Sequence, residues 1–558
     1  MQDPDRAGNF ERHNRFDDPY SPDHNDGLFR ALGFLYHLTM NLLRSVATVG
    51  GFTSISRVLG FVRDILIAAT LGAGWIADCF FVAFKIPNFF RRLFAEGAFN
   101  AAFVPLFSEL LTADGQVEAR RFAEQALAVL LTVLILFVGF LQIFMPWVMM
   151  GLAPGFVSTP EKYDLAVVLT RITIPYLMFI SLVSLMGGVL NSLGRFAAVA
   201  ATPILLNLCL IASLLWLART TETPAHALAW GVSVAGVLQF LWLAFECHRA
   251  GVSLRLPRPR LSPKVKNLLL LMAPAALGAG VVQVNLLIDV VIGSLLPTGS
   301  LSYLFYADRL NQLPIGVVGV AVGTALLPML SRQVAANQTD AALNSQNRAI
   351  EFGMLLTIPA AAALMTIPGP LVSVLFERGA FGAVETRATA LALTAYAAGL
   401  PAYVLIKVLG PGFYARKDTR TPVRFAIIAV IVNVVLNLVL MVPLKHVGLA
   451  LATAISAWLN VSLLAVTLAR RGHLQIDPRL RRRLPRTVIA ASLMAAGLWG
   501  GAAMFGPMLV AGEGPRALAL AVLVVGGMAA FTVLARLLGV VDSNDLKGLL
   551  RGGQAAPD

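Results

Sequence analysis

Residues 56–97 read SRVLGFVRDILIAATLGAGWIADCFFVAFKIPNFFRRLFAEG, an apolar stretch that is interrupted by charges. Leu, Ile, Phe and Ala dominate it, as in a segment that spans a membrane. It also contains the charged side chains Arg57, Arg63, Asp64, Asp78, Lys85, Arg91, Arg92 and Glu96. Each such side chain costs roughly 2.5–3.5 kcal/mol at the centre of a membrane-spanning helix. A membrane protein that keeps so many costly charges is expected to need them for its function.

The composition of the whole chain places this stretch in a polytopic membrane protein. Of the 558 residues, 57% are hydrophobic and 13% are charged, and the mean hydropathy is +0.75. Soluble proteins are about 45–50% apolar and about 25% charged, so a soluble protein with a large core is excluded. We expect an all-α protein.

Apolar segments long enough to cross a hydrocarbon core of about 30 Å occur fourteen times. They are residues 44–71, 74–106, 123–150, 164–191, 197–218, 227–247, 267–296, 300–331, 350–376, 387–411, 423–443, 447–469, 487–511 and 516–540. Basic residues concentrate in the connections that follow even-numbered segments, whereas those after odd-numbered segments are poor in them. By the positive-inside rule, the sequence predicts a multi-pass protein with both termini in the cytoplasm.

The two most basic connections are residues 249–266 and 470–486. We interpret them as topology signals that face the anionic lipids of the cytoplasmic leaflet. Nucleic acid is the alternative ligand for such clusters, and we expect none here.

An internal duplication divides the chain into two lobes. LGAGWIADCFFVAFKIPN (71–88) resembles LPTGSLSYLFYADRLNQLP (296–314), and Pro-x-x-Ser recurs in FVPLFSEL (103–110) and LLPMLSRQ (326–333). A repeat of six segments keeps its orientation, so the lobes are parallel repeats around a central cavity. The predicted units are a polar extension (1–39), an N-lobe (40–250), a C-lobe (251–470), two further helices (471–545) and a cytoplasmic tail (546–558).

The intramembrane charges are expected to line that cavity. Arg57, Gly60 and Asp64 share one helix face, and Asp78, Lys85 and Arg92 recur every seven residues. The second lobe contributes Asp308 and Arg309. Cations outnumber anions in this set, and arginine binds phosphate oxygens in a bidentate manner. The predicted ligand is a phosphate or pyrophosphate, and the predicted substrate-binding residues are Arg57, Arg63, Asp78, Lys85, Arg91, Arg92, Glu96 and Arg309. Snorkelling to the interface is the alternative for Lys85, Arg91 and Arg92.

A second polar group is predicted between three later segments. Asp289 stands alone in VVQVNLLIDVVIG, Asn433 and Asn437 are spaced i, i+4, and Thr453 follows in the next segment. Their oxygens suit a small hard cation such as Na⁺, or a proton held on the carboxylate. A hydrogen-bonded Asp–Asn contact between helices is the alternative.

Motifs of several enzyme classes are absent from the sequence. It has no G-x-x-x-x-G-K-[ST] loop for ATP hydrolysis, no HExxH and no nucleophile elbow. The three cysteines (Cys79, Cys209 and Cys247) lie at no metal-ligand spacing. We expect a transporter rather than an enzyme, with no cofactor beyond a coupling ion.

Four longer blocks resemble the MviN/MurJ family of bacterial lipid II flippases, within the multidrug/oligosaccharidyl-lipid/polysaccharide exporter superfamily. They are SRVLGFVRD, DCFFVAFKIPNFFRRLFAEGAF, FYADRLNQLPIGVVGVAVGTALLP and KVLGPGFYARKDTRTPV. The resemblance runs from Met40 to about residue 540 and implies fourteen helices, two six-helix lobes and alternating access. MNLLRS (40–45) resembles the usual start of the family, so residues 1–39 are an extension.

The resemblance also implies a function in peptidoglycan biosynthesis, cell-wall biogenesis and cell shape. The substrate would be lipid II, an undecaprenyl-pyrophosphate-linked precursor that is moved across the bacterial cytoplasmic (inner) membrane. Arg57, Arg63, Asp78, Arg91 and Arg309 match cavity positions of the family. The last two helices would form a groove for the lipid tail, and Asp289, Asn433, Asn437 and Thr453 match a sodium site of some relatives. We expect a monomer.

Three rival functions differ from this one in testable ways. A cation-coupled multidrug exporter of the same fold should favour acidic cavity residues. A membrane-embedded enzyme acting on lipid-linked sugars should carry a catalytic carboxylate in a large extracytoplasmic loop, whereas the loops here are short. A flippase for another polyprenyl-linked glycan would share the arginines, and nothing in the sequence identifies the sugar.

Overall fold

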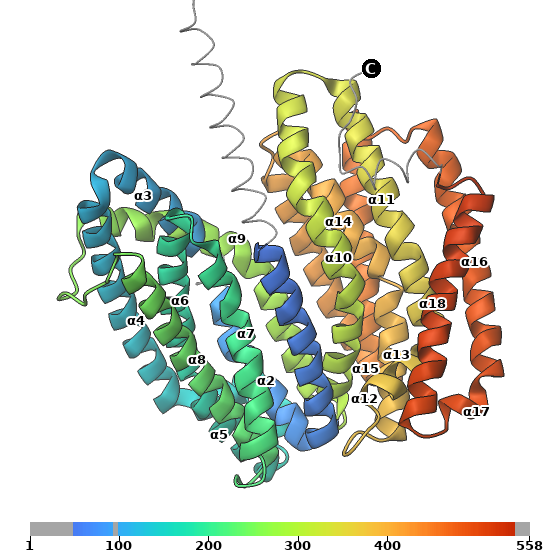
Figure 1. The fold of residues 1–558 in the computed structure, drawn as a ribbon, viewed down its shortest axis with the longest axis horizontal. Coiled ribbons are helices and arrows are strands. Elements are labelled where there is room, and N and C mark those ends of the chain that lie inside the picture. Colours follow the sequence, from blue (N-terminus) through green and yellow to red (C-terminus); the bar gives the residue numbers. More distant parts are fainter. Residues whose placement is uncertain (1–47, 93–98, 542–558) are drawn as a thin grey trace, which may run out of the picture.

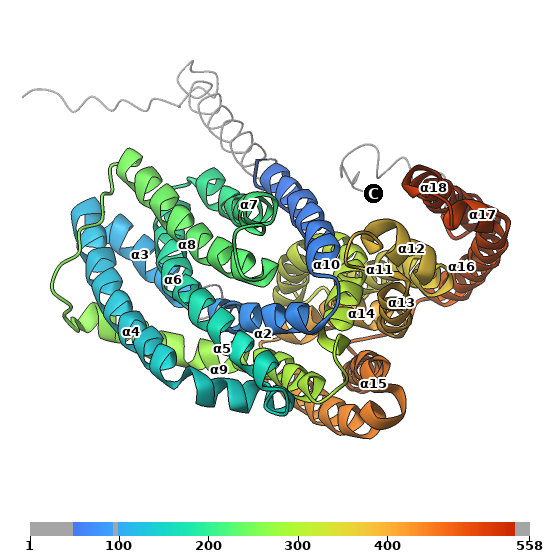
Figure 2. The same cartoon turned by 90° about the horizontal axis from the view of Figure 1, so that it is seen from below.

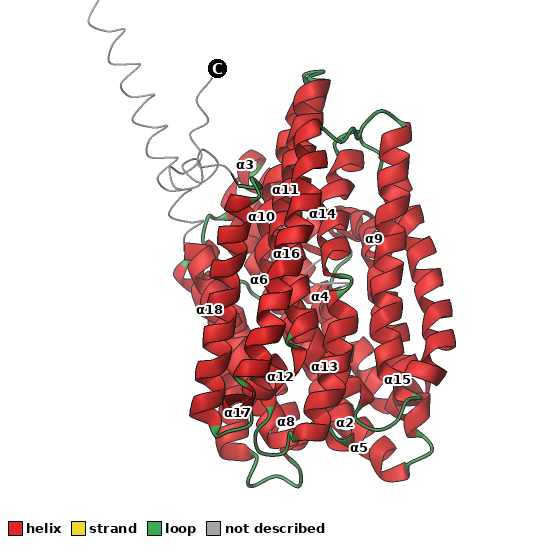
Figure 3. Cartoon of the chain, turned by 90° about the vertical axis from the view of Figure 1, so that its right-hand side faces the viewer, coloured by secondary structure: helices red, strands yellow, loops and turns green. Residues whose placement is uncertain are grey.

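The computed structural model describes residues 48–92 and 99–541, and every regular element within them is a helix. The helices run along one common direction (Figure 3). The predicted all-α class is therefore confirmed. The extension 1–39, the tail 546–558 and Glu96 lie outside the described residues.

A first group of helices contains the first half of the duplication. Its members are a helix over residues 48–71, α2 (Trp75–Phe90), α3 (Asn100–Ala113), α4 (Gly115–Leu152), α5 (Pro160–Thr173), α6 (Pro175–Ser192), α7 (Phe196–Ala212) and α8 (Pro224–Arg249). Two short elements, η2 (Pro154–Phe156) and η3 (Ser213–Leu217), complete it. Proline stands in the first turn of α5, α6 and α8, where its missing N–H costs no hydrogen bond.

A second group contains the second half. Its members are α9 (Pro263–Ser294), α10 (Ser300–Ala335), α11 (Thr339–Thr366), α12 (Pro368–Phe376), α13 (Ala383–Ala397), α14 (Leu400–Tyr414) and α15 (Arg420–Arg470). Inside α15, Lys445 has non-helical angles (φ 50°, ψ −130°), two residues after Pro443. The predicted segments 423–443 and 447–469 are thus two helices that meet at a kink.

The last three helices are α16 (Pro478–Met504), α17 (Gly506–Leu509) and α18 (Glu513–Leu537). α16 packs against α11, and α18 packs against α16 and α12. Figure 2 shows them at the outer edge of the second group. The division of the chain into two lobes and a unit of residues 471–545 stays a prediction.

Each of the fourteen predicted segments overlaps one described helix or two consecutive ones, and two of the segments lie in α15. Within the described residues, nine helices are long and apolar enough to cross a membrane. One of them, α15, has 51 residues, which at about 1.5 Å per residue is enough for two crossings. The count of fourteen crossings stays a prediction.

The two groups meet at one end of the molecule. In Figure 1 they come together at the end where α2 and α12 lie and stand further apart at the opposite end, where α3 lies. The largest buried apolar cluster crosses this junction. Phe81 of α2 stacks on Phe305 of α10 with ring centroids 3.9 Å apart, and Tyr306 packs edge-on against Phe381. Aromatic pairs of this kind add about 0.5–1.5 kcal/mol each to burial.

Helix α9 contacts both groups. It packs against α15 and α10 of the second group and also against α4 and α3 of the first. Near its start, Lys264 forms an ion pair of 3.2 Å with Asp114, at the α3–α4 turn. The predicted lobe boundary at residue 250 therefore precedes a helix that both groups share.

Candidate functional site

Asp78 joins the two groups of helices. Its side chain in α2 is 1% exposed. Its carboxylate accepts hydrogen bonds from the backbone N–H of Gly299 (2.8 Å) and Ser302 (3.0 Å) and from the Ser302 hydroxyl (2.7 Å), and Lys162 Nζ of α5 lies 3.1 Å away. The first N–H groups of a helix have no partner within it. The positive end of the helix dipole also stabilises a carboxylate at this position.

Glycine makes this approach possible. Gly299, directly before α10, has φ +91°, and a Cβ there would lie 2.5 Å from the Ala73 carbonyl oxygen. The loop of residues 71–74 therefore packs directly against the start of α10 only because no side chain intervenes. In this conformation the Asp78 carboxylate is enclosed by protein donors.

Arg63 and Asp64, in the helix over residues 48–71, form a second buried cluster. Arg63 donates to Asp64 (2.6 Å) and to Asn207 Oδ1 of α7 (2.9 Å). Across the junction, Arg309 Nε of α10 lies 3.4 Å from Asp64, and its guanidinium covers the Phe305 ring at 4.7 Å. Two arginines thus share one carboxylate, which leaves a net positive charge.

Arg57 lies two turns before Asp64 on the same helix and is exposed. Its guanidinium lies against α10, because a Cβ at Gly316 would be 2.8 Å from Nη1. It makes no hydrogen bond or ion pair with any residue in the described part of the chain. Lys407 of α14 is near enough for the two positive charges to repel each other.

Further charges lie near Arg309. Lys85 of α2 interacts electrostatically with Asp308, Asp289, Arg309 and Arg92, and Asp308 accepts a hydrogen bond from Gln312. Arg91 Nε donates to Asn88 at 3.2 Å, at the end of α2. The structure therefore brings Arg63, Asp64, Lys85 and Arg309 into one electrostatic neighbourhood at the junction.

The residues of the second predicted site converge. Asn437 Nδ2 donates to Asp289 Oδ1 (2.8 Å) and to Asn433 Oδ1 (3.1 Å), and Asn433 Nδ2 lies 3.5 Å from Thr453 Oγ1. With the Asn433 amide reversed, its nitrogen donates to Asp289 at 3.3 Å and to Asn285 Oδ1 at 3.1 Å. The α9 and α15 residues thus form one polar group.

One atom of this group lacks a hydrogen bond. Asn437 Oδ1 is buried and has no donor among the residues that the structure describes. Together with the Asp289 carboxylate and the Asn285 amide, it provides oxygen ligands of the type that hard cations prefer. Over residues 48–92 and 99–541, no cluster of three His, Cys, Asp or Glu side chains could hold a metal. A cation here would depend on the single Asp289 carboxylate together with amide and hydroxyl oxygens.

A family model described as "Lipid II flippase MurJ" matches residues 67–519. A Rhizobium tropici protein named "Probable lipid II flippase MurJ" is 45% identical over 529 residues, which cover 93% of this chain and 98% of that protein. "Lipid II flippase MurJ" of Burkholderia cenocepacia is 39% identical over 469 residues, 82% of this chain and 90% of that protein. The chain belongs to the lipid II flippase MurJ family.

Solved structures agree with this membership. One described as "Lipid II flippase MurJ, inward closed conformation" matches with a TM-score of 0.73 at 25% identity, over 88% of this chain and 99% of that chain. An inward-facing MATE family transporter of the MOP superfamily matches with a TM-score of 0.64 at 13% identity, over 75% and 94% of the two chains, which shows the fold alone. The chain is a multi-pass membrane protein of the MurJ fold.

Some residues of these clusters were not predicted from the sequence. Lys162 is one of few cations in the connections after odd-numbered segments, which singles it out but does not reveal its partner. Asn285 lies at i, i+4 from Asp289, so helical spacing could have found it. Asn207 and Ser302 contact their partners from positions 144 and 224 residues away in the chain, and no local pattern signals that.

Proposed function

We propose that this chain moves lipid II from the inner to the outer leaflet of the bacterial cytoplasmic membrane by alternating access. The observation that carries the proposal is Arg57, an exposed guanidinium between the helix over residues 48–71 and α10 that no described residue neutralises. Arg63 and Arg309 extend the positive charge inward from it. Pyrophosphate would bind these groups in a bidentate manner.

The contacts between the groups support an inward-facing state. Several hydrogen bonds between them lie at the end that the charge pattern assigns to the outside: Ala380 N to Ala69 O, Gly155 N to Ser294 Oγ, Tyr306 Oη to Gly72 O, and the bonds of Asp78. This end is closed by hydrogen bonds and aromatic packing. At the other end α9 and the Lys264–Asp114 ion pair connect the groups, and the proposed cavity would open to the cytoplasm beside them.

Substrate would favour the outward-facing state by neutralising positive charge. Arg57 and Lys407 are like charges near each other, and a bound pyrophosphate would lower the cost of bringing them closer together. A ligand shifts such an equilibrium only by its difference in affinity for the two states. A positive cavity also responds to the membrane potential, by about 2.3 kcal/mol per charge per 100 mV.

Asp289 and its amide neighbours are proposed as the site of a coupling cation, Na⁺ or H⁺. The unpartnered Asn437 oxygen supports this, because a buried amide oxygen without a donor costs about 1–3 kcal/mol. Asp289 and Lys85 interact electrostatically, so a cation bound at Asp289 would act on the charges of the proposed substrate site.

The membrane arrangement follows from the charge pattern. Both termini would be cytoplasmic, and exposed basic residues such as Arg481 and Arg482 would contact anionic phospholipids. Leu518, Val525 and Met528 of α18 are 59%, 61% and 59% exposed, which supports a lipid-facing role of the last helices for the prenyl tail. The protein would act as a monomer and without catalytic chemistry.

The test is complementation of a bacterial strain that is depleted of its own lipid II flippase. The wild-type chain should restore growth and the exposure of lipid II on the outer face of the membrane, measured with an externally added lipid II-cleaving enzyme. A chain that is expressed and inserted but restores neither would contradict the proposal. Transport of another polyprenyl-linked glycan in the same cells would favour the rival flippase function.

A further inference from the structure

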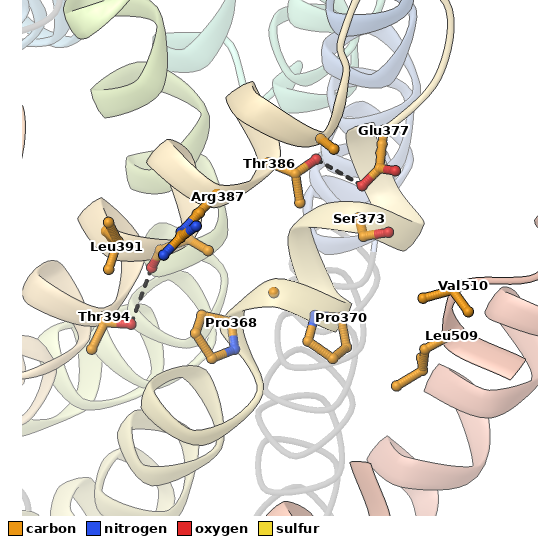
Figure 4. A pocket seen from close by; sticks show the side chains of 13 residues that line it. Pro368, Pro370, Ser373, Glu377, Thr386, Arg387, Leu391, Thr394, Leu509 and Val510 are labelled. Carbon is orange, nitrogen blue, oxygen red and sulfur yellow. Dashed lines mark hydrogen bonds between the residues drawn. The ribbon is translucent and has the colours of Figure 1, made fainter. Parts of the chain in front are cut away.

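A pocket of about 380 Å³ lies between α12, α13 and the α17 turn. Its volume is within the range of ligand sites. Figure 4 shows Arg387 and Leu391 on α13, Pro368 and Pro370 on α12, and Leu509 and Val510 beyond them. The walls are thus largely apolar, and they join the second group of helices to the last three.

Arg387 is the unsatisfied charge of this pocket. It is exposed and makes no hydrogen bond or ion pair with any residue over 48–92 and 99–541. The pocket's carboxylate, Glu377, is already engaged: Arg516 Nη1 lies 3.3 Å from it and Thr386 Oγ1 donates to it at 2.9 Å. The Thr394 hydroxyl near Arg387 already donates to the Ala390 carbonyl oxygen at 3.0 Å. The pocket therefore presents one free cation and an apolar wall.

A second pocket, of about 350 Å³, is lined by Arg378, Glu513 and Arg516, the partner of Glu377. Arg378 Nη2 donates to the Val374 carbonyl oxygen at 2.7 Å, but its Nε is buried and has no acceptor in the described part of the chain. A buried N–H without an acceptor is uncommon. It points to a missing oxygen ligand beside the first pocket.

These arginines are unusual for their side of the membrane. The connections assigned to the outside carry few cations: Lys162, Arg219, Arg378, Arg387, Lys445 and Arg516. Arg378, Arg387 and Arg516, half of them, line these two adjacent pockets. The positive-inside rule disfavours basic residues there, so their concentration indicates an anionic ligand at this end.

We propose that the pocket between α12, α13 and α17 binds the phosphate headgroup of an anionic lipid in the outer leaflet. The phosphate contacts Arg387, and the hydrocarbon chains lie against Leu391, Leu509 and Val510. Bound lipid would fasten α17 and the last helices to the second group. The proposal depends on the membrane orientation given above, but not on the identity of the transported substrate.

The test is native mass spectrometry of the full chain in detergent, titrated separately with phosphatidylglycerol, undecaprenyl phosphate and inorganic phosphate. Replacing Arg387 by Gln should weaken phosphatidylglycerol binding about tenfold, the effect of losing one charge-assisted hydrogen-bonding partner. Leu391→Trp, which fills the pocket and keeps the charge, should weaken it similarly. Arg219→Gln removes an exposed arginine of the same membrane side outside the pocket and should have no effect.

Each outcome either supports or overturns the proposed lipid site. Weaker lipid binding by both pocket variants but not by Arg219→Gln supports the site, and the lipid that binds more tightly identifies its source as a glycerophospholipid or a polyprenyl phosphate. Equal binding by wild type and Arg387→Gln would overturn it, as would equal loss in Arg219→Gln. Saturation by inorganic phosphate without lipid binding would overturn the assignment to a lipid. Because no transport is measured, these results are separate from those of the complementation experiment.

Discussion

At the scale of single residues, Asp78 and Arg57 show two different uses of charge in a membrane interior. Asp78 is enclosed by one lysine, two backbone N–H groups and a hydroxyl. Arg57 is exposed and has no partner among the described residues. The first arrangement closes the junction between the groups, and the second remains available to a ligand. Both residues were predicted as substrate-binding, and the role of each stays a prediction.

Replacing Asp78 by Asn should loosen the closed end. The carboxamide cannot pair with Lys162, whose ammonium would remain buried without a counter-charge, a loss that costs about 3–5 kcal/mol in buried pairs. The reporter is Cys79, which is buried and lies 3.2 Å from the Lys162 carbonyl oxygen. With Cys209 and Cys247 changed to Ser, a membrane-impermeant maleimide added from outside should label Cys79 faster in Asp78→Asn than in wild type.

Lys162→Met removes the other partner of the Asp78–Lys162 ion pair. It should also make Cys79 label faster than in wild type. Unchanged labelling in both variants would mean that the ion pair does not hold this end closed.

Asp289→Asn should abolish any stabilisation by sodium. A cation that binds only the folded protein raises stability by RT ln(1 + [L]/Kd), about 2.7 kcal/mol at 100 Kd. The melting temperature of the purified wild type should therefore rise with NaCl relative to choline chloride, and the variant should show no difference. Asp340→Asn, at an exposed carboxylate of α11, serves as the control. A wild type indifferent to sodium would leave the Asp–Asn helix contact, or a proton, as the role of this group.

At the scale of elements, side-chain charges determine how the last helices and the connections are held. Glu351 of α11 accepts hydrogen bonds from Arg483 of α16 at 2.6 Å, from Arg479 at 3.3 Å and from Arg348. Arg483 is 7% exposed. The docking of α16 on the second group thus rests on a buried ion pair beside its apolar contacts.

Glu351→Ala should destabilise the protein markedly, because it leaves the Arg483 guanidinium buried without its carboxylate, at about 3–5 kcal/mol. The control is Glu118→Ala, which removes the exposed i, i+3 partner of Arg121 and should cost well under about 1 kcal/mol. Thermal unfolding in detergent measures both. Similar melting temperatures for the two variants would contradict the role given to Glu351.

The connection between α14 and α15 predicts a pH effect. Arg471 and the N–H and hydroxyl of Thr421 hold the pKa of the Asp418 carboxyl well below its usual range. A carboxyl whose pKa is lower in the folded state stabilises the protein above its unfolded pKa, about 3.9, and that stabilisation is lost as the pH falls further. The melting temperature of wild type should therefore drop more steeply below about pH 4 than that of Asp418→Asn. Parallel curves would show that this pairing contributes nothing.

At the scale of the whole molecule, periodicity and charge predicted the helices well. Apolar length located the segments, and the duplication predicted two similar groups with an appendage. Two separate segments were predicted where the structure has one long element with a kink at Lys445. These features depend on residues close together in sequence, where hydrophobic length and spacing act directly.

Contacts between distant helices could be predicted only in part. The convergence of Asp289, Asn433, Asn437 and Thr453 was predicted with the help of the family resemblance, because lone polar residues in apolar segments must find partners. The pairing of Asp78 with Lys162, and the packing of α9 on both groups, were not. They depend on which helix faces pack against each other, and the order of residues along the chain does not reveal that.

The arginines at the junction are proposed to bind the pyrophosphate of the transported lipid. The measurement is the movement of headgroup-labelled lipid II in proteoliposomes under a membrane potential, followed by an external quencher. Wild type and Arg219→Ala should move the label, whereas Arg57→Ala combined with Arg309→Ala should lose at least about 90% of the rate, since each lost charge-assisted contact costs about 1.5–3 kcal/mol. Equal rates for the folded double variant and wild type would contradict the account.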